Sequence, residues 1–112
     1  MKIYHNPRCS KSRQTLALIN EKGADVEIIE YLSNIPTEQE LTEVLALLGI
    51  SAEQLIRKGE KDYKENYKGK SLSNEEWIKA MIAYPKLIER PIVVKDNKAV
   101  LGRPPENVLD LL

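Results

Sequence analysis

The stretch "KIYHNPRCSKSRQTLALINEKGADVEIIEYL", residues 2–32, predicts the fold of this chain. Lys2 to His5 is a strand candidate, and Lys11 to Lys22 is expected to form a helix that ends at Gly23. Val26 to Leu32 is rich in β-branched residues and predicts a second strand. A strand, a helix and a strand within about 30 residues form a βαβ unit, whose strands run parallel with a right-handed crossover.

The middle of the chain is expected to be helical, over roughly residues 37–84. Capping-box pairs mark three helix starts, at Thr37 and Glu40, Ser51 and Gln54, and Ser73 and Glu76. Residues 58–72 are lysine-rich and predict a loop or a ragged helical turn. The block is too short and too closely flanked by strands to stand alone. We therefore predict a helical insertion within a single domain that spans residues 1–112.

The end of the chain predicts two more strands. "PIVVK", residues 91–95, and Ala99 to Leu101 flank a short turn, so this pair is expected to be antiparallel. "GRPPENVLDLL" closes the chain with a helix that its prolines can start but not continue. The predicted fold is α/β, with a mixed four-stranded sheet flanked by helices.

Composition narrows the class of protein. The 112 residues include 17 basic and 17 acidic side chains, and this balance argues against a nucleic-acid binder. No apolar run approaches the roughly 20 residues of a membrane span, and the N-terminus lacks the apolar region of a signal peptide. The cytoplasm is therefore the expected location, where a single cysteine should remain a free thiol.

Cys9 stands between the first strand and the first helix. Free N–H groups and the dipole of a helix N-terminus lower the pKa of a thiol placed there. Arg8, Lys11 and Arg13 are expected to add positive potential, and His5 a hydrogen bond or a charge. These polar neighbours favour a reactive cysteine over a buried structural one, although free cysteines are often buried.

Ser12 lies where a dithiol oxidoreductase carries its second cysteine. With serine there, the site cannot resolve a disulfide internally, so an external thiol must supply electrons. A structural role for Ser12 in the first helical turn is equally open.

Two other kinds of site do not fit the sequence. A phosphatase-like loop would need an arginine where this chain has Thr15. One cysteine and one histidine do not supply the four ligands of a zinc site, so we expect no metal.

Three further arginines lie at the ends of predicted elements: Arg57, Arg90 and Arg103. The planar guanidinium group suits tetrahedral oxyanions, although a single surface arginine is usually only a solvated charge. Two of the three precede prolines at strand or helix starts. Pro91 leads directly into a strand and is a candidate for a cis peptide bond.

The chain resembles the glutaredoxin-coupled arsenate reductases, which have a thioredoxin-like fold. The matching segments are "IYHNPRCSKSRQTLALI", "LIRKGEKDY", "ERPIVV" and "LGRPPENVLDLL". By position, Cys9 matches the family's nucleophile and His5 the histidine near it. The other matches are the oxyanion-binding arginines at Arg57, Arg90 and Arg103, the cis-proline at Pro91, and the Cys-x-x-Ser-Arg turn at Ser12 and Arg13. Ser10 and Lys11 replace the Gly-Thr pair of the best-studied members.

The resemblance implies reduction of arsenate to arsenite by the Cys9 thiolate. Glutathione would be the reducing co-substrate and glutaredoxin the protein partner, with no bound cofactor and no nucleic-acid or membrane partner. Two alternatives remain from the residues alone. One is a non-enzymatic redox-sensing module or one that binds transcription machinery, and the other is a thiol oxidoreductase with a different substrate.

Overall fold

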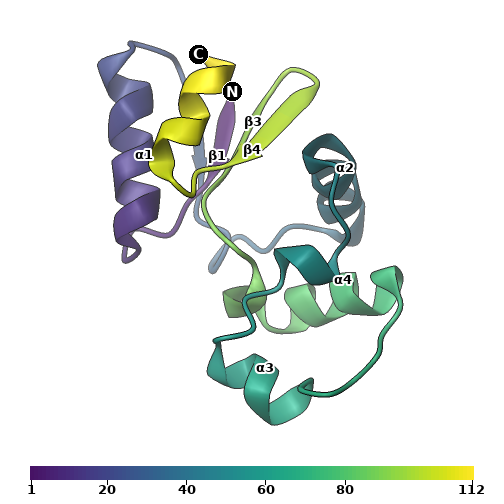
Figure 1. Ribbon diagram of the computed structural model, residues 1–112. Helices are drawn as coiled ribbons and strands as arrows, with labels where there is room; N and C mark the ends of the chain where they lie inside the picture. The colour runs from purple at the N-terminus through teal and green to yellow at the C-terminus, as the bar shows by residue number, and fades with distance from the viewer. The chain divides into compact units, whose positions relative to one another are not determined.

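The fold is described from a computed structural model that covers residues 1–112. The chain divides into two compact units. The sheet unit comprises Met1–Asn34 and Arg90–Leu112, and the helical unit, Ile35–Glu89, is inserted between these two segments in the sequence (Figure 1). That both units together form one domain stays a prediction.

The sheet unit contains one mixed four-stranded sheet, as predicted. Its strands are β1 (Lys2–Tyr4), β2 (Glu27–Ile29), β3 (Ile92–Lys95) and β4 (Lys98–Leu101). They lie in the order β2-β1-β3-β4. β1 runs parallel to β2 and antiparallel to β3, and β3 and β4 form an antiparallel hairpin.

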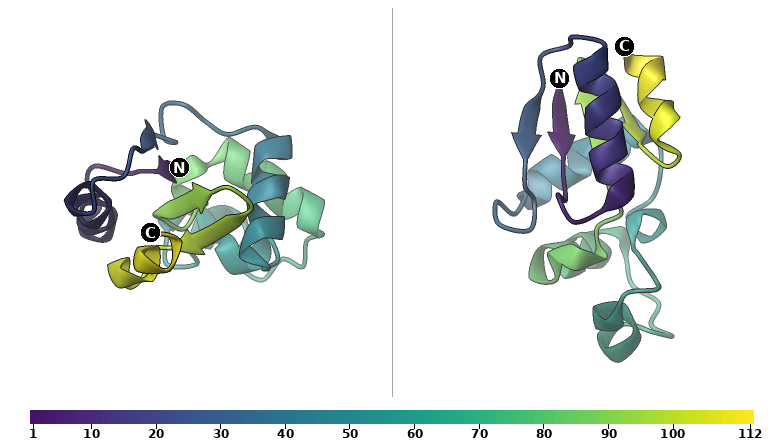
Figure 2. Two further views of the ribbon diagram at one scale, coloured as in Figure 1. Left: turned by 90° about the horizontal axis from the view of Figure 1, so that it is seen from above. Right: turned by 90° about the vertical axis from the view of Figure 1, so that its left-hand side faces the viewer.

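One face of this sheet is covered by helix α1 (Ser10–Glu21) and by η3 (Pro105–Leu111), a 3₁₀-helix (Figures 1 and 2). The core between the sheet and these two helices is apolar. Four of its side chains have no solvent exposure: Ile3, Ile19, Val93 and Val108. Ile3 and Val93 are register partners, so their side chains project to the same side of the sheet. This apolar layer holds the N-terminal helix and the C-terminal segment against the strands.

Strand β2 is shorter than predicted, because the chain turns at Glu30 rather than continuing to Leu32. The backbone N–H of Asn34 donates to the carbonyl of Glu30 at 2.8 Å. Strand β1 offers only three residues for pairing, so β2 ends where its partner does. Tyr31 lies in the turn and is nevertheless almost fully buried.

The helical unit contains three α-helices and two 3₁₀ turns. They are α2 (Glu38–Leu48), η1 (Glu53–Leu55), α3 (Lys61–Asn66), α4 (Asn74–Ala83) and η2 (Pro85–Leu87). The capping boxes predicted at Thr37 and Ser73 are both present.

No helix in the chain combines the length and apolar character needed to cross a membrane.

One segment of the helical unit differs from expectation, and in the lysine-rich segment the helical one of the two expected forms is present. The helix predicted after Ser51 is only the turn η1, because Ile56 is extended and forms an antiparallel bridge with Ile88. Within the lysine-rich segment, α3 forms a short helix. Its Tyr63 and the following Tyr67 contact the ring of Trp77 on α4, at centroid distances of 6.3 and 5.8 Å. Aromatic contacts, which the local pattern did not indicate, stabilise this helix.

The capping box of α4 makes a measurable prediction for stability. In it, the Ser73 hydroxyl accepts a hydrogen bond from the backbone of Glu76. Replacing Ser73 with alanine should lower the free energy of unfolding by about 1 kcal/mol in urea denaturation. Ser71→Ala is the control, because Ser71 is exposed and lies two residues before the cap. Equal stability of the two variants would contradict the prediction.

Candidate active site

Four chain segments meet at one end of the sheet. Tyr4 ends β1 and pairs with Ile92, which begins β3, and Ile92 pairs with Leu101, which ends β4. The residues that lie immediately beyond these strand ends are therefore neighbours. They are His5 after β1, Pro91 before β3 and Gly102 after β4, with Glu30 after the parallel strand β2. His5 and Pro91 of this row were singled out by the sequence, and Arg90 and Arg103 directly adjoin it in the chain.

Cys9 lies at the start of α1 and is its N-cap residue. Its backbone is extended, its carbonyl accepts the first helical hydrogen bond from Arg13 at 3.0 Å, and its N–H donates to Asn6 at 3.0 Å. The residue is buried, with 8% of its surface exposed. The thiol therefore stands at the N-terminus of α1, as the sequence predicted, where the backbone N–H groups of the first turn have no helical acceptor.

The pKa of the Cys9 thiol is lowered from its ordinary value. Burial alone would raise it, but the backbone N–H groups of Ser12 and Lys11 and the charges of Arg90 and Arg103 together outweigh burial. All four stabilise the thiolate, which is the nucleophilic form. The guanidinium groups that lower this pKa are thus those of Arg90 and Arg103, whereas the sequence suggested the nearby side chains of the turn itself.

His5 and Ser12 form a buried polar pair beneath the turn. His5 Nδ1 and Ser12 Oγ are 2.7 Å apart, and the backbone N–H of Asn6 donates to the same hydroxyl at 3.1 Å. Ser12 has no solvent exposure. It therefore fills the structural role that the sequence left open, by tying the end of β1 to the first turn of α1.

The pKa of His5 is also lowered. Burial is the largest cause; the charge of Glu30 raises the pKa in part, and the charge of Arg13 lowers it. His5 is accordingly neutral at pH 7. Because His5 takes up a proton more readily in the unfolded chain, protonation favours unfolding. The stability that neutral His5 contributes is present above the ordinary histidine pKa of about 6.5 and is lost as the pH falls from there through the lowered pKa of the folded chain. Because Nδ1 of His5 is hydrogen-bonded to Ser12, His5 positions the turn in this geometry.

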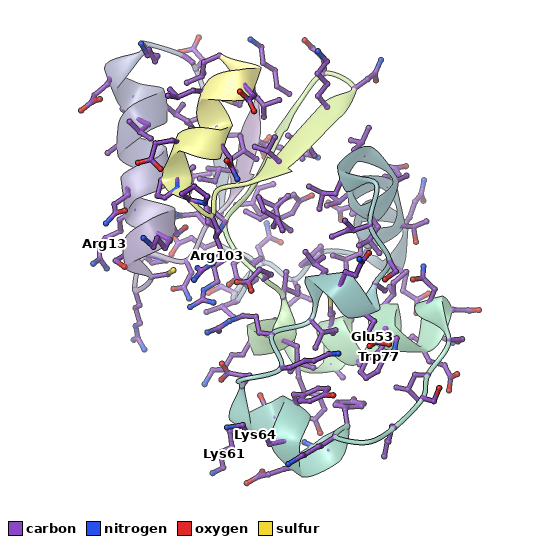
Figure 3. The ribbon with its side chains drawn as sticks, viewed as in Figure 1. Arg13, Glu53, Lys61, Lys64, Trp77 and Arg103 are labelled. Atoms are coloured by element: carbon purple, nitrogen blue, oxygen red, sulfur yellow. The ribbon has the colours of Figure 1, made fainter.

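Arg90 and Arg103 occupy two adjoining proline segments of the sheet unit. The Arg90–Pro91 peptide bond is cis, as predicted, and the Arg103–Pro104 bond is cis as well, which the sequence did not indicate. Arg103 Nη1 donates to the backbone carbonyl of Arg90 at 3.3 Å. Figure 3 shows Arg103 at the end of the sheet unit where α1 begins, and Arg13 on the outer side of that helix.

Arg13 and Arg57 have their own partners. Arg13 is exposed and donates to the carbonyl of Pro7 at 3.0 Å, which closes the turn before Cys9. Arg57 belongs to the helical unit, where it pairs with Glu60 at 3.0 Å and more distantly with Glu89 at 3.9 Å. Its participation in an oxyanion site stays a prediction.

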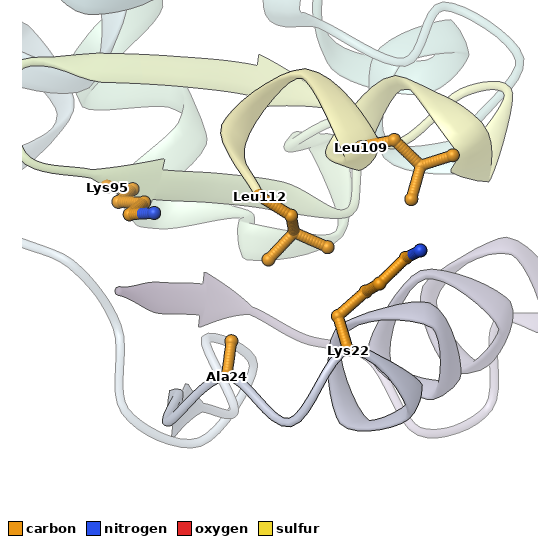
Figure 4. Close-up of a pocket in the computed structure, with 5 residues that line it drawn as sticks. All are labelled: Lys22, Ala24, Lys95, Leu109 and Leu112. Carbon is orange, nitrogen blue, oxygen red and sulfur yellow. The ribbon is translucent and has the colours of Figure 1, made fainter.

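A pocket of the sheet unit lies elsewhere. It has a volume of about 460 Å³ and is lined by Lys22, Ala24, Lys95, Leu109 and Leu112 (Figure 4). Lys22 follows the last residue of α1, whereas Cys9 precedes the first. A helix of 12 residues is about 18 Å long, so this pocket is at the far end of α1 from the thiol. It takes no part in the candidate site.

Two residues of this end of the sheet were missed by the sequence interpretation. Thr15 is fully buried and hydrogen-bonds to the carbonyls of Lys11 and Gly102, and Gly102 is buried against it. The "LGRPP" segment contained a signal, since a glycine beside two prolines indicates a tight backbone path. Nothing in the sequence paired that glycine with Thr15, because 87 residues separate them.

Comparison with known proteins places this geometry in a family. Residues 4–111 match the ArsC family. The chain is 51% identical to uncharacterized protein YfgD of Escherichia coli over 114 residues, which cover 100% of this chain and 96% of that protein. It is 46% identical to an arsenate reductase of Haemophilus influenzae over 112 residues, covering 98% and 97%.

A solved structure shows the same architecture. The arsenate reductase from Vibrio cholerae superimposes with a TM-score of 0.94 at 46% identity, covering 100% of this chain and 98% of that one. The fold is thus thioredoxin-like, and a thiol stands at the N-terminus of its first helix. The chain belongs to the ArsC family.

The electrostatics of the thiol can be tested directly. Arg90→Ala and Arg103→Ala should each raise the pKa of Cys9, because each removes a positive charge that stabilises the thiolate. The rate of iodoacetamide alkylation, measured against pH, reports this pKa. Lys22→Ala removes the same charge at the opposite end of α1 and serves as the control. Unchanged pH profiles in both arginine variants would show that the thiol is activated by other groups.

Proposed function

We propose that this protein reduces arsenate to arsenite, with Cys9 as the nucleophile and glutathione and glutaredoxin as the reductants. One observation carries the proposal: the only cysteine is a buried helix N-cap whose pKa is lowered by the N–H groups of its own helix and by two arginines from the neighbouring strand ends. Several relatives at more than 40% identity are named arsenate reductases. The same two arginines supply the charge that an oxyanion substrate needs.

The proposed chemistry begins with the thiolate. Cys9 sulfur attacks arsenic, an S–As bond forms, and an arsenate oxygen leaves as water after taking up protons. Arg90 and Arg103 neutralise charge on the remaining oxygens. His5, neutral and hydrogen-bonded to Ser12, holds the turn that presents the sulfur.

Reduction then requires a second thiol from outside the chain. Glutathione sulfur attacks the Cys9 sulfur, so an S–S bond forms while the S–As bond breaks. The electron pair of that bond stays on arsenic, which passes from the +5 to the +3 state and departs as arsenite. Serine at position 12 leaves the mixed disulfide without an internal partner, and glutaredoxin is proposed to release Cys9 by attacking the glutathione sulfur.

Cys9→Ser is the decisive variant. It should abolish arsenate-dependent NADPH oxidation in an assay coupled through glutathione, glutaredoxin and glutathione reductase, because a serine hydroxyl at neutral pH is a far weaker nucleophile. Circular dichroism should show that the variant is folded. Normal turnover by Cys9→Ser would overturn the proposal, and an inactive wild type would favour a different substrate or a binding role.

Arg57 is proposed as a third arginine on the oxyanion. In this role it would exchange its Glu60 partner for an arsenate oxygen. Arg57→Ala should then raise KM for arsenate about tenfold or more, since a charge-assisted hydrogen bond contributes about 1.5–3 kcal/mol and 1.4 kcal/mol corresponds to tenfold. Lys58→Ala is the matched control, because this neighbouring cation is exposed and pairs with Glu53. Equal KM values for both variants would remove Arg57 from the site.

A further inference from the structure

We propose that Gly102 is a positioning residue of the candidate site: because it carries no side chain, β4 ends directly against Thr15 and Pro91, and this contact sets where Arg90 and Arg103 lie. The inference about the thiol concerns the sheet unit alone. Its extension to substrate affinity rests on the proposed function.

Gly102 is the one glycine of the chain whose surroundings leave no space for a side chain. A Cβ atom built there would lie 2.7 Å from Cγ of Pro91 and 3.0 Å from Cγ2 of Thr15, and closer still to Thr15 Oγ1. The other four glycines have nothing within 4 Å of such an atom. The backbone of Gly102 is not left-handed, so space rather than backbone conformation requires glycine here.

Neither neighbour can readily move aside. Thr15 is fully buried in α1, and its hydroxyl donates to the carbonyl of Lys11 at 2.8 Å, which restrains a β-branched side chain further. Pro91 is buried and has a rigid ring. Its carbonyl accepts a hydrogen bond from the N–H of Gly102 at 2.9 Å. A methyl group at Gly102 must therefore displace the end of β4.

Such a displacement would reach both arginines. Arg103 follows Gly102 directly, and its guanidinium group donates to the carbonyl of Arg90 at 3.3 Å. The amide of Asn107 binds the carbonyls of Leu101 and Arg103, at 3.1 and 3.2 Å, and so holds the segment around Gly102 as one piece. Because α1 carries both Thr15 and the N-cap Cys9, the glycine contact joins the helix that bears the thiol to the segments that bear its counter-charges.

The test is Gly102→Ala, followed by alkylation of Cys9 with iodoacetamide over a range of pH. The pH midpoint of alkylation should rise toward that of an ordinary thiol, while circular dichroism shows the native secondary structure. Gly59→Ala is the control, since Gly59 also lacks a positive φ and has open space around it. It should leave the midpoint unchanged.

A double-mutant cycle separates positioning from general damage. In an Arg103→Ala background, Gly102→Ala should raise the midpoint by less than it does in the wild type, because the charge that it displaces is already absent. Equal increments in both backgrounds, or no increment in a folded Gly102→Ala variant, would overturn the proposal. Should Gly102→Ala fail to fold, Thr15→Val supplies a milder change at the same contact. It should also raise the pH midpoint of Cys9 alkylation, and an unchanged midpoint would overturn the inference.

Substrate kinetics extend the test. Gly102→Ala should raise KM for arsenate more than it lowers kcat, since the arginines are shifted while the nucleophile is retained. The alkylation experiment uses no arsenate, so it stands even where the proposed reductase activity fails. Activity abolished by Cys9→Ser but unaffected by Gly102→Ala would, conversely, leave the proposed function intact and remove the role of Gly102 in substrate binding.

Discussion

The pairing of β3 with β1 on one side and β4 on the other is the constraint on which the candidate site depends. It brings the end of β1, the start of β3 and the end of β4 to one end of the sheet. The thiol arrives there through β1 and α1, and the two arginines arrive through the strands that follow the helical unit. In the sequence, Arg90 and Arg103 lie 81 and 94 residues after Cys9, so only this strand pairing brings the charges to the sulfur.

The electrostatic balance at Cys9 follows from that arrangement. Burial opposes ionisation of the thiol, and a cysteine inside an apolar core would remain protonated. The helix N–H groups of Ser12 and Lys11 and the guanidinium groups of Arg90 and Arg103 together outweigh this cost and lower the pKa of the thiol. A partly dry, positively charged environment of this kind also suits an oxyanion, since charge interactions are stronger where water is excluded. In the proposed function, activation of the nucleophile and binding of the substrate would use the same groups.

Local sequence patterns predicted most of the secondary structure because their causes are local. Each capping box, at Thr37 and at Ser73, joins side chains only three positions apart. Each strand and helix of the first 30 residues is likewise marked by the pattern of its own residues. The errors occur where distant contacts decide. The segment after Ser51 is interrupted by the bridge to Ile88, and β2 ends with its short partner. In the lysine-rich segment, where the local pattern left a loop or a helical turn open, packing on the ring of Trp77 favours the short helix α3.

The sequence by itself determined that the chain has a single thiol at a helix N-terminus, without an internal partner to form a disulfide. Tertiary structure decided which charges act on that thiol. Arg8 and Arg13 are near Cys9 in the chain, but Arg90 and Arg103 lower its pKa, because electrostatic energy depends on distance through space and strand pairing sets that distance. The steric fit of Gly102 against Thr15 was likewise invisible in the sequence, since two surfaces distant in the chain must meet before space becomes limiting.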